Sequence, residues 1–551
     1  MESKRWVSSI LLGLSVLGVS SFAEAKEWFV ASGGSGNGDT ATPFGKIQDG
    51  LSAAMPGDTV TVRAGTYAEA LKSARDGSAA MPITLRAEAG AQVVVSMAGE
   101  LLQVDHAYLV VEGLQFDGQY VNADLLDIND GANSLVLRNV EVRRATKDCI
   151  DMGAPKDVLI EDSLIHHCLN SAGGQTDAHG VTGGAVRNLQ IVGTEIHTIS
   201  GDAIQFDPGR QLPGWGDILV DGCKLWTGPL AAAENGFAAG AVPGENAIDT
   251  KTNAAAPRAK LTIRNTSAWG FRGGFISNMA AFNLKENIDA ELDGVTVFDS
   301  EIAFRTRGPG SNGGAWVSIK NAVVFDVDKA VRYEDDIDKL VVYNSTFGEK
   351  VTTGFQAASS GATQADVRNL LVLGSALPKE AALPSNLTAS ASAFLDVTKN
   401  DYRLASGAAA IDKGETLPSV SHDRAGTARP QGTAYDVGAY EDCAPPNCGN
   451  AGGGGVGAGG SGGSSSGGAP GVGGTAGGQA GGAGAGAGAA TGGSGNAGAA
   501  GNKATDSGDD GGCGCGVPAK GSGSAPLLSL VMLLLGVRRR RRCLDLRKGH
   551  R

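Results

Sequence analysis

The chain has 551 residues, a formal net charge of −12 at pH 7 and 85 glycines, and only 5% of its residues are aromatic. Each glycine inside a helix costs about 1 kcal/mol relative to alanine, so this composition argues against a mainly helical protein. The acidic balance argues against a polyanion coating the whole surface, and we expect no nucleic-acid partner.

The N-terminus carries an export pattern. Residues 1–25, "MESKRWVSSILLGLSVLGVSSFAEA", combine a basic start, a short apolar stretch and small residues at Ala23 and Ala25. This pattern predicts a secretory signal peptide that is cleaved after Ala25. The apolar run is shorter than a membrane-spanning helix requires, so we expect a secreted protein.

Residues 105 to 350 repeat a pattern of alternating apolar residues that ends in Gly, Asn or Asp, as in "LVVEG", "LVLRN" and "VLIED". The closing residues are Gly113, Asn139, Asp162, Gly193, Gly222, Asn265, Gly294, Asn321 and Asn344. Their spacing runs from 23 residues (139 to 162) to 43 residues (222 to 265). Short alternating strands that end in a residue able to adopt left-handed backbone predict the coils of a parallel β-helix. The leucine-rich-repeat framework is absent, and a propeller needs more strands per repeat.

Three segments resemble a known superfamily. The stretch Trp28–Tyr67, above all "PGDTVTVRAGTY", is similar to the first coil of right-handed parallel β-helix proteins of the pectate-lyase-like superfamily. "AIDKG" (Ala410–Gly414) and "DVGAYE" (Asp436–Glu441) resemble the closing strands of the same group. The resemblance implies an all-β, right-handed parallel β-helix over residues 26–442, an extracellular location and, often, a polysaccharide substrate. Fold alone does not fix function.

Each coil has a second strand, and these strands can be aligned on Leu126, Ile150, Val181, Ile204, Ile248, Phe275, Phe304 and Val331. If these residues point inward, the positions one and three residues later point outward. The first outward column is Asp127, Asp151, Thr182, Gln205, Asp249, Ile276, Arg305 and Arg332. The second is Asn129, Gly153, Gly184, Asp207, Lys251, Asn278, Arg307 and Glu334. One outer face is therefore predicted to run from acids to bases, which meet at Asp249 and Lys251.

This mixture of groups suits a lyase that cleaves uronate-containing polysaccharide. The proton next to the uronate carboxylate is poorly acidic, so a cation or an arginine must neutralise charge before a base removes that proton. Lysine acts as a base only when neutral, and nearby cations such as Arg305 and Arg307 favour that form. We expect Arg305, Arg307, Arg332 and Asn278 to bind an acidic polysaccharide. The long loop "GPLAAAENGFAAGAVPGE" just before the strand of Lys251 supports a functional site there.

"ENAIDTKTN" (Glu245–Asn253), followed by "RNTSAWGFRGG", is similar to the lysine-then-arginine arrangement of alginate and chondroitin lyases of the β-helix class. The resemblance implies that Lys251 is the base, that Arg272 is its partner arginine, and that Glu245 and Asp249 are calcium ligands. We add Asp207 to this expected calcium set. The chain departs from the pattern at two places: Ala247 stands where a second acid is expected, and threonines flank Lys251 where serines are expected.

Two alternatives stay open. "TDAHGVTGG" (Thr176–Gly184) places Asp177 and His179 beside Asp151 and Asp207, which resembles inverting polygalacturonase-type hydrolases. The adjacent double aspartate of that class is missing, because Asp202 and Asp207 stand apart. The other alternative is a non-catalytic, glycan-binding adhesin, for which Trp215, Trp226 and Trp269 lie near the predicted face.

Cys443 and Cys448 close the folded part in "CAPPNC" and could form a disulfide in an exported protein. Cys149, Cys168 and Cys223 lie in patterned segments, where we expect buried small residues. Residues 443–512 continue into a stretch of Gly, Ala and Ser, which predicts a disordered linker.

The last segment, residues 513–551, contains "CGCG", the apolar stretch Leu527–Val537 and the arginines Arg538–Arg542. This three-part pattern resembles the MYXO-CTERM surface-sorting tail. The resemblance implies export, processing of the tail and attachment to the cell envelope at the outer cell surface, with the linker as a stalk. We expect the β-helix to be a monomer.

Overall fold

The structure, a computed structural model, describes residues 24–121, 123–170, 177–207, 209–307, 314–334, 337–358, 364–443 and 448. The predicted signal peptide lies almost wholly outside the described residues. The predicted Gly-rich linker from residue 449 onward and the predicted sorting tail lie outside them as well.

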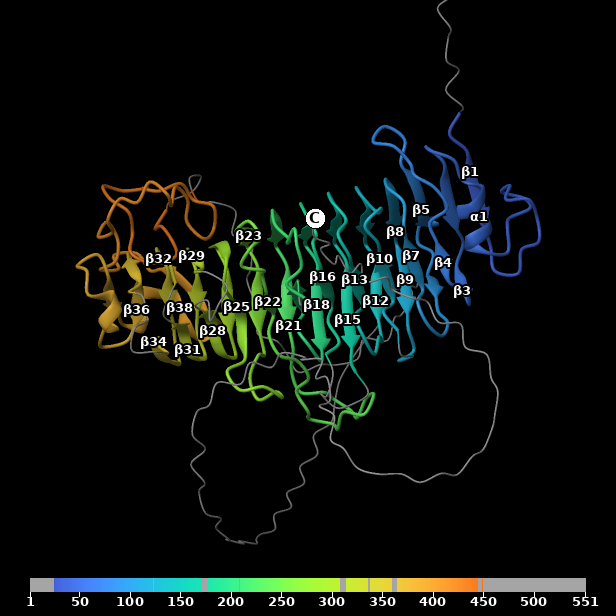
Figure 1. The fold of residues 1–551 in the computed structure, drawn as a ribbon. Helices are drawn as coiled ribbons and strands as arrows, with labels where there is room; N and C mark the ends of the chain where they lie inside the picture. The colour runs from blue at the N-terminus through green and yellow to red at the C-terminus, as the bar shows by residue number, and fades with distance from the viewer. Residues whose placement is uncertain are drawn as a thin grey trace, which may run out of the picture. The chain divides into compact units, whose positions relative to one another are not determined.

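The described residues form a parallel β-helix whose coils contribute one strand to each of three sheets (Figure 1). Sheet 1 has 13 strands: β1 (Glu27–Val30), β2 (Thr59–Val62), β5 (Ile83–Ala87), β8 (Leu109–Glu112), β11 (Val136–Arg138), β14 (Leu159–Glu161), β17 (Gln190–Val192), β20 (Ile218–Asp221), β23 (Ala259–Arg264), β26 (Ile288–Asp293), β29 (Trp316–Lys320), β32 (Lys339–Tyr343) and β35 (Asp366–Arg368). Sheet 2 also has 13: β3 (Gly65–Tyr67), β6 (Val93–Val95), β9 (Leu114–Asp117), β12 (Glu141–Arg143), β15 (Leu164–Cys168), β18 (Glu195–Ile199), β21 (Lys224–Trp226), β24 (Ser267–Trp269), β27 (Thr296–Phe298), β30 (Val323–Val324), β33 (Thr346–Phe347), β36 (Leu371–Leu373) and β37 (Leu387–Ala389). Sheet 3 has 11: β4 (Leu71–Lys72), β7 (Leu102–Val104), β10 (Leu126–Ile128), β13 (Ile150–Met152), β16 (Val181–Gly183), β19 (Ile204–Phe206), β22 (Ile248–Thr250), β25 (Ala280–Leu284), β28 (Ser300–Thr306), β31 (Val327–Tyr333) and β34 (Val351–Ala357).

The corner between sheet 1 and sheet 2 is made by the turn residues that the repeat predicted. All nine have positive φ, from 45° at Asn344 to 76° at Gly113. Glycine and asparagine tolerate this left-handed backbone better than other residues. The predicted β-helix and the position of this corner are therefore confirmed.

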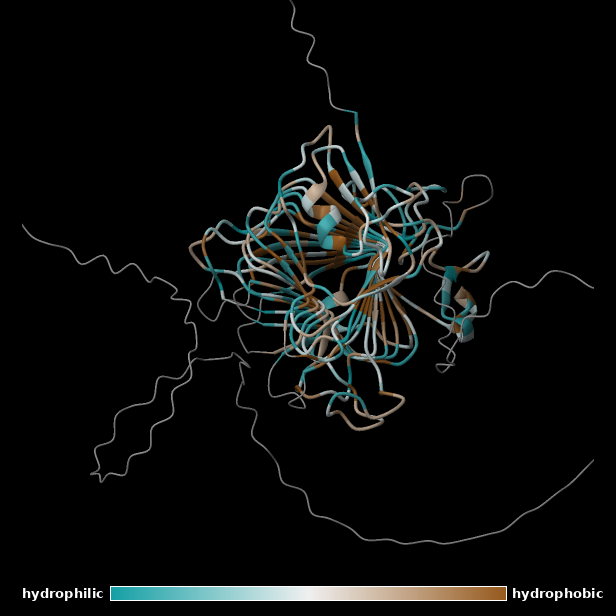
Figure 2. Ribbon diagram, turned by 90° about the vertical axis from the view of Figure 1, so that its right-hand side faces the viewer, coloured by the Kyte–Doolittle hydropathy of each residue, from teal (hydrophilic) through white to brown (hydrophobic). Residues whose placement is uncertain are grey.

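The core is a stack of apolar residues in register between coils. On sheet 3, for example, Leu126 pairs with Ile150, and Ile204 pairs with Ile248. Each of these side chains is fully buried. Figure 2 shows the apolar strands packed toward the interior and hydrophilic residues frequent in the loops. A single coil could not bury this face, so the core depends on stacking.

Helix α1 (Ile47–Ala53) covers the first coil: it buries Ile47 and Leu51 beside β1, at the blue end in Figure 1. The last coils are followed by η1 (Lys379–Ala381), which contacts β35, and then by η2 (Ala391–Ala393), η3 (Val397–Lys399) and the antiparallel pair β38 (Phe394–Asp396) and β39 (Asp401–Leu404). Phe394 and Tyr402 of this pair share a buried cluster with Leu371, so the pair packs against sheet 2. In the described part of the chain, no helix is both long and apolar enough to cross a membrane.

One predicted alignment is wrong. Ile248 pairs with Phe282 and Asp249 with Asn283, whereas Phe275 lies in the loop between β24 and β25. Ile276 and Asn278 therefore do not belong to the outward columns. All five residues of β25, Ala280–Leu284, are buried, so this strand lacks the alternation that the alignment followed.

The disulfide expectations are partly corrected. Cys149 and Cys168 are bonded, with their Cα atoms 5.8 Å apart, instead of being separate buried residues. They come from adjacent coils, and only the coil register brings them together. Cys443 and Cys448 are also bonded, and Cys223 is buried and free.

Replacing both Cys149 and Cys168 by serine is expected to lower the free energy of unfolding by about 3 kcal/mol. The bond closes a loop with a sequence separation of 19 residues, and closing a loop of this size restricts the unfolded chain by about that amount. Urea unfolding of the oxidised proteins measures the difference. Equal midpoints for the variant and the unmodified chain would contradict the prediction.

Candidate functional site

The outer face of sheet 3 changes from acidic to basic along the stack. Asp127 and Asp151 are in register on early coils, and Arg305 and Arg332 are in register on late ones. Between them, Gln205 pairs with Asp249, Asp249 with Asn283, and Asn283 with Arg305. Successive coils are about 4.8 Å apart, so Asp249 lies two coils from Arg305.

Asp249 joins two lysines at the centre of this face. Its side chain is buried, and Lys285 Nζ lies 2.9 Å from each of its carboxylate oxygens. Asn283 Nδ2 donates to Oδ1 at 2.9 Å. Lys251 Nζ is 3.8 Å from Oδ2, outside hydrogen-bond distance. The geometry thus distinguishes a tightly held amine, Lys285, from a looser one, Lys251.

A group of carboxyls lies next to Asp249, where the loops from sheet 2 enter sheet 3. Burial raises the pKa of Glu245 to about 8, with added repulsion from Asp202 and Asp177. Burial likewise raises the pKa of Asp202 to about 6, with repulsion from Asp249. Burial, followed by the charge of Asp148, raises the pKa of Asp151 to about 7. These groups can hold protons near neutral pH.

His179 is buried within this group. Its Nδ1 lies 2.8 Å from Asp148 Oδ1, and its Nε2 lies 3.9 Å from both Asp177 and Asp202. Burial alone would lower its pKa, but the charge and hydrogen bond of Asp148, with the charges of Asp202 and Asp177, raise that pKa to about 9. His179 is therefore a buried cation among carboxyls.

The free energy of unfolding is expected to fall as pH rises from about 4 to about 9. The unfolded acids lose their protons near pH 4, whereas folded Asp151 and Glu245 retain theirs to about 7 and 8. His179, whose folded pKa is about 9, contributes stability below its unfolded pKa near 6.5 that is lost as pH rises through 9. Its share is on the order of 3 kcal/mol. Urea unfolding at a series of pH values across this range measures the trend. In His179→Gln, the free energy of unfolding should fall less steeply above about pH 6.5 than in the unmodified chain. Stability that rises with pH over this range would be the contrary result.

The residues of the hydrolase alternative are partly brought together. Asp177 and Asp202 both lie 3.9 Å from His179 Nε2. Asp151 is close enough to His179 for the charge of the imidazole to oppose the rise in the pKa of Asp151. Asp207 is held apart: its Oδ1 accepts a 2.8 Å hydrogen bond from the backbone N–H of Gln211.

Arg272 does not contact Lys251 in the described structure. Its Nε lies 3.1 Å from Asp299 and its Nη1 lies 3.7 Å from Asp326. Its Nη2 also donates to the carbonyl of Ser300 at 3.0 Å. These partners hold the guanidinium at the corner between sheets 2 and 3. To act in catalysis, Arg272 would have to leave two ion pairs.

The predicted calcium ligands do not form a ligand set. The oxygens of Asp249 face Lys285 and Asn283, and Asp207 accepts from Gln211. Within the described residue ranges, no group of three or more His, Cys, Asp or Glu side chains is arranged to hold a metal ion. Glu245, Asp249 and Asp207 are thus not gathered into such a group, and calcium binding stays a prediction.

Sequence analysis missed Asp148, Asn283 and Lys285. Lys285 follows Phe282 by three residues, as Lys251 follows Ile248. Aligning "AFNLK" with "AIDTK" would have found both Asn283 and Lys285. Asp148 had no comparable signal, because it precedes its strand and acts through a histidine one coil away.

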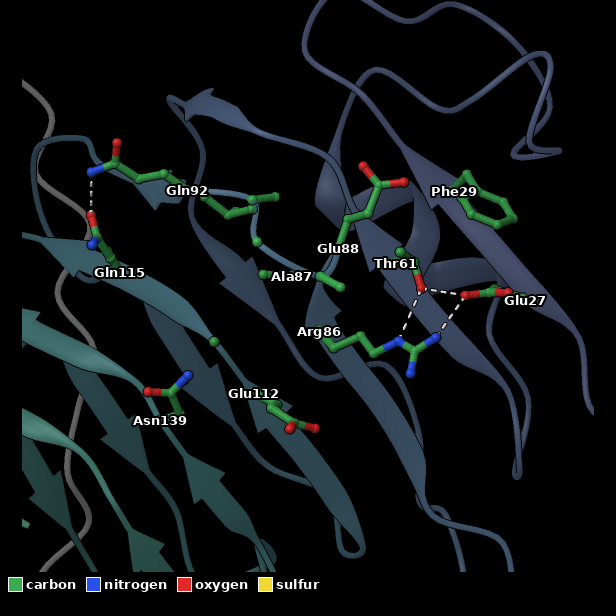
Figure 3. Close-up of a pocket in the computed structure, with 15 residues that line it drawn as sticks. Glu27, Phe29, Thr61, Arg86, Ala87, Glu88, Gln92, Glu112, Gln115 and Asn139 are labelled. Atoms are coloured by element: carbon green, nitrogen blue, oxygen red, sulfur yellow. Dashed lines mark hydrogen bonds and ion pairs between the residues drawn. The ribbon is translucent and has the colours of Figure 1, made fainter. Parts of the chain in front are cut away.

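A cavity of about 770 Å³ lies elsewhere, on the first coils (Figure 3). Two of its charged lining residues are paired with each other, because Arg86 lies 2.9 Å from Glu27 and both contact Thr61. The hydrogen bond from Thr61, opposed by burial and assisted by Arg86, lowers the pKa of Glu27. Glu27 therefore stays charged, unlike the carboxyls around Asp249, and the cavity is the weaker candidate for chemistry.

Residues 44–134 match the family model described as chondroitinase B, which covers less than a fifth of the chain and ends before Asp148. Among curated proteins, no sequence match was found. The chain is similar to the crystal structure of pectate lyase Pel9A, with 16% identity, 76% of this chain and 97% of that chain covered, and a TM-score of 0.47. It is also similar to an alginate lyase from Paenibacillus sp. str. FPU-7, with 18% identity, coverage of 55% and 94%, and a TM-score of 0.39. A polygalacturonase from Erwinia carotovora ssp. carotovora shows 12% identity, coverage of 67% and 100%, and a TM-score of 0.39.

The described residues form a parallel β-helix. At these identities the likeness concerns the course of the backbone and not the side chains of the site. The chemistry must be argued from Asp249 and its neighbours.

Proposed function

We propose that this protein is a polysaccharide lyase that cleaves uronate-containing polysaccharide by β-elimination, with Lys251 as the base. The observation that supports this proposal is the pair of lysines on one buried carboxylate, 3.8 Å and 2.9 Å from Asp249. One carboxylate balances one ammonium, so the second amine can work as a neutral base without leaving Asp249 unpaired.

The tighter contact assigns different roles to the two amines. Lys285 lies 2.9 Å from both oxygens of Asp249 and acts as its fixed countercharge. Lys251 makes no hydrogen bond through Nζ with a described residue, and its side chain is 14% exposed. Lys251 is therefore the amine that can turn toward a bound sugar.

In the proposed reaction, Lys251 Nζ removes the proton from C5 of the uronate residue. The released electron pair forms the C4=C5 double bond, and the bond from C4 to the glycosidic oxygen breaks. The leaving oxygen takes up a proton, from protonated Lys251 or from water. The products are one new reducing end and one unsaturated uronate, and no water is added across the bond.

Incubation of residues 26–442 with pectate, alginate and chondroitin tests the proposal. A lyase produces ultraviolet absorbance from unsaturated uronate on at least one of these polymers. Parallel reactions with added calcium and with a chelator test calcium as a cofactor, which the predicted ligands alone do not support. Absence of absorbance on all three polymers, with and without calcium, would count against a lyase of this class.

Hydrolysis is the second candidate, favoured by the carboxyls that hold protons near neutral pH. A general acid of a glycoside hydrolase needs a raised pKa, and burial with neighbouring acids gives one to Glu245, Asp202 and Asp151. New reducing ends without ultraviolet absorbance would assign this reaction. If neither signal arises but the polymer binds, the adhesin alternative is favoured.

We further propose that the protein is exported, displayed at the outer cell surface through its C-terminal tail and monomeric. The Cys149–Cys168 and Cys443–Cys448 disulfides support export, because such bonds persist in oxidising compartments. Trypsin treatment of intact cells, followed by detection of the β-helix, tests surface display.

A further inference from the structure

Arg305 carries a charge that the described protein does not neutralise. Its side chain is half-buried and makes no hydrogen bond or ion pair with any described residue, and its Nε is buried without a partner. Burial, and then the charges of Arg307 and Arg332, lower the pKa of Arg305 to about 10. A buried unpaired charge is unfavourable for the folded state.

The surrounding charges do not remove this excess. Arg305 pairs in strand register with Arg332 on the next coil, about 4.8 Å away along the stack. Glu334 is the nearby acid, and it lies 3.5 Å from Arg307. Arg332 donates from Nη1 to an amide oxygen, that of Asn278, at 2.8 Å. Arg305 and Arg332 thus form a cationic pair with no carboxylate of its own among the described residues.

The loop that contacts Arg332 also presents an aromatic ring. Phe275 is 47% exposed, and its ring packs on Phe237 with centroids 5.5 Å apart. Phe275 is three residues from Asn278, so it lies within about 10 Å of that contact. Exposed aromatic rings offer apolar faces to the C–H groups of sugars, and paired guanidinium groups match the two oxygens of a carboxylate.

The distance from the lysine pair decides which carboxylate is bound. Arg305 lies two coils from Asp249 and Arg332 lies three, or about 10 and 14 Å along the stack. This is too far for the carboxylate of the sugar that loses its proton at Lys251. A carboxylate bound by the arginine pair must therefore belong to another residue of the same polymer.

We propose that Arg305 and Arg332 form a subsite for the carboxylate of a second uronate residue, away from the bond that is cleaved, with Phe275 beside the sugar ring. This inference rests on the proposed function, since it assumes that the polymer lies along the outer face of sheet 3. The substrate class is then a polymer with repeated uronate residues bound along the solenoid axis. Disaccharides would reach the lysines without reaching the arginines.

Calorimetric titration of Lys251→Ala with tetrameric and dimeric oligogalacturonate and oligoalginate tests the subsite without turnover. We expect the tetramer of either oligogalacturonate or oligoalginate to bind to Lys251→Ala. Adding Arg305→Gln to this variant should weaken the affinity for that tetramer at least tenfold and leave the affinity for the dimer unchanged. The matched control is Arg368→Gln, because Arg368 is paired with Asp366 and Glu415 on sheet 1. Methyl-esterified tetramer should bind as weakly as the tetramer binds to the Arg305 variant.

Thermal unfolding of Arg305→Gln separates a binding role from a structural one. Removing an unpaired charge should leave Tm unchanged or raise it, whereas loss of a structural contact would lower it. Equal tetramer affinity for Arg305→Gln and its parent would overturn the subsite even if unsaturated uronate is formed. Arg305-dependent binding without unsaturated product would overturn the lyase proposal and leave the subsite standing. Failure of both tetramers to bind would overturn the subsite.

Discussion

Lys251→Ala is expected to lower the rate of unsaturated uronate formation by about 100- to 10,000-fold, the range for loss of a general base. The amine it removes is the looser of the two at Asp249, 3.8 Å from Oδ2. Folding should be preserved, because Lys285 stays in contact with both oxygens of Asp249. Initial rates of absorbance increase at saturating polymer measure the effect.

Arginine variants separate the two lysines. Arginine keeps a positive charge but cannot act as a base, so Lys251→Arg should be inactive, while Lys285→Arg should keep a countercharge at Asp249 and retain measurable activity. Lys260→Ala is the matched control, because Lys260 is an exposed lysine of β23 on sheet 1. Activity in Lys251→Arg together with its loss in Lys285→Arg would reverse the two roles and make Lys285 the base.

Asp249→Ala is expected to lower the free energy of unfolding by about 3–5 kcal/mol and to abolish activity. The substitution leaves Lys285, which is 9% exposed, without its carboxylate, and an unpaired buried charge costs about this much. It also removes the acceptor for Asn283. Urea unfolding gives the stability change.

A double variant tests whether the buried charge is the cause. Asp249→Leu with Lys285→Met removes both charges and should recover part of the lost stability, since replacing a buried pair by apolar residues is often close to neutral. Activity should not return, because the carboxylate 3.8 Å from Lys251 Nζ and the Lys285 ammonium bound to that carboxylate are both removed. A loss of less than about 1 kcal/mol in Asp249→Ala would show that the pair is not buried in solution.

The fold could be predicted because its signals are local and repeated. Each of the nine turn residues, from Gly113 to Asn344, occupies a left-handed position that only a few residue types tolerate. The alignment failed at one coil, where β25 is buried along its whole length and shows no alternation. The alignment assigns "GFISN" (Gly274–Asn278) to this coil, although that segment lies in the loop between β24 and β25.

The site could be predicted only in part, because its contacts join coils. Lys251 and Asp249 are two residues apart on one strand, so the sequence identified both. Lys285 reaches Asp249 from a position 36 residues later, and Asp148 reaches His179 across 31. Cys149 and Cys168 meet in the same way. Such pairs depend on the exact length of every intervening loop, which periodicity does not specify.

The most direct test of β-elimination compares two signals in one digestion of the preferred polymer by residues 26–442: unsaturated uronate from absorbance and new reducing ends from a colorimetric assay. The proposed mechanism predicts one unsaturated uronate for every new reducing end throughout the time course, and loss of both signals in Lys251→Ala. New reducing ends that accumulate without unsaturated uronate would contradict it and assign the chemistry to the carboxyls around His179.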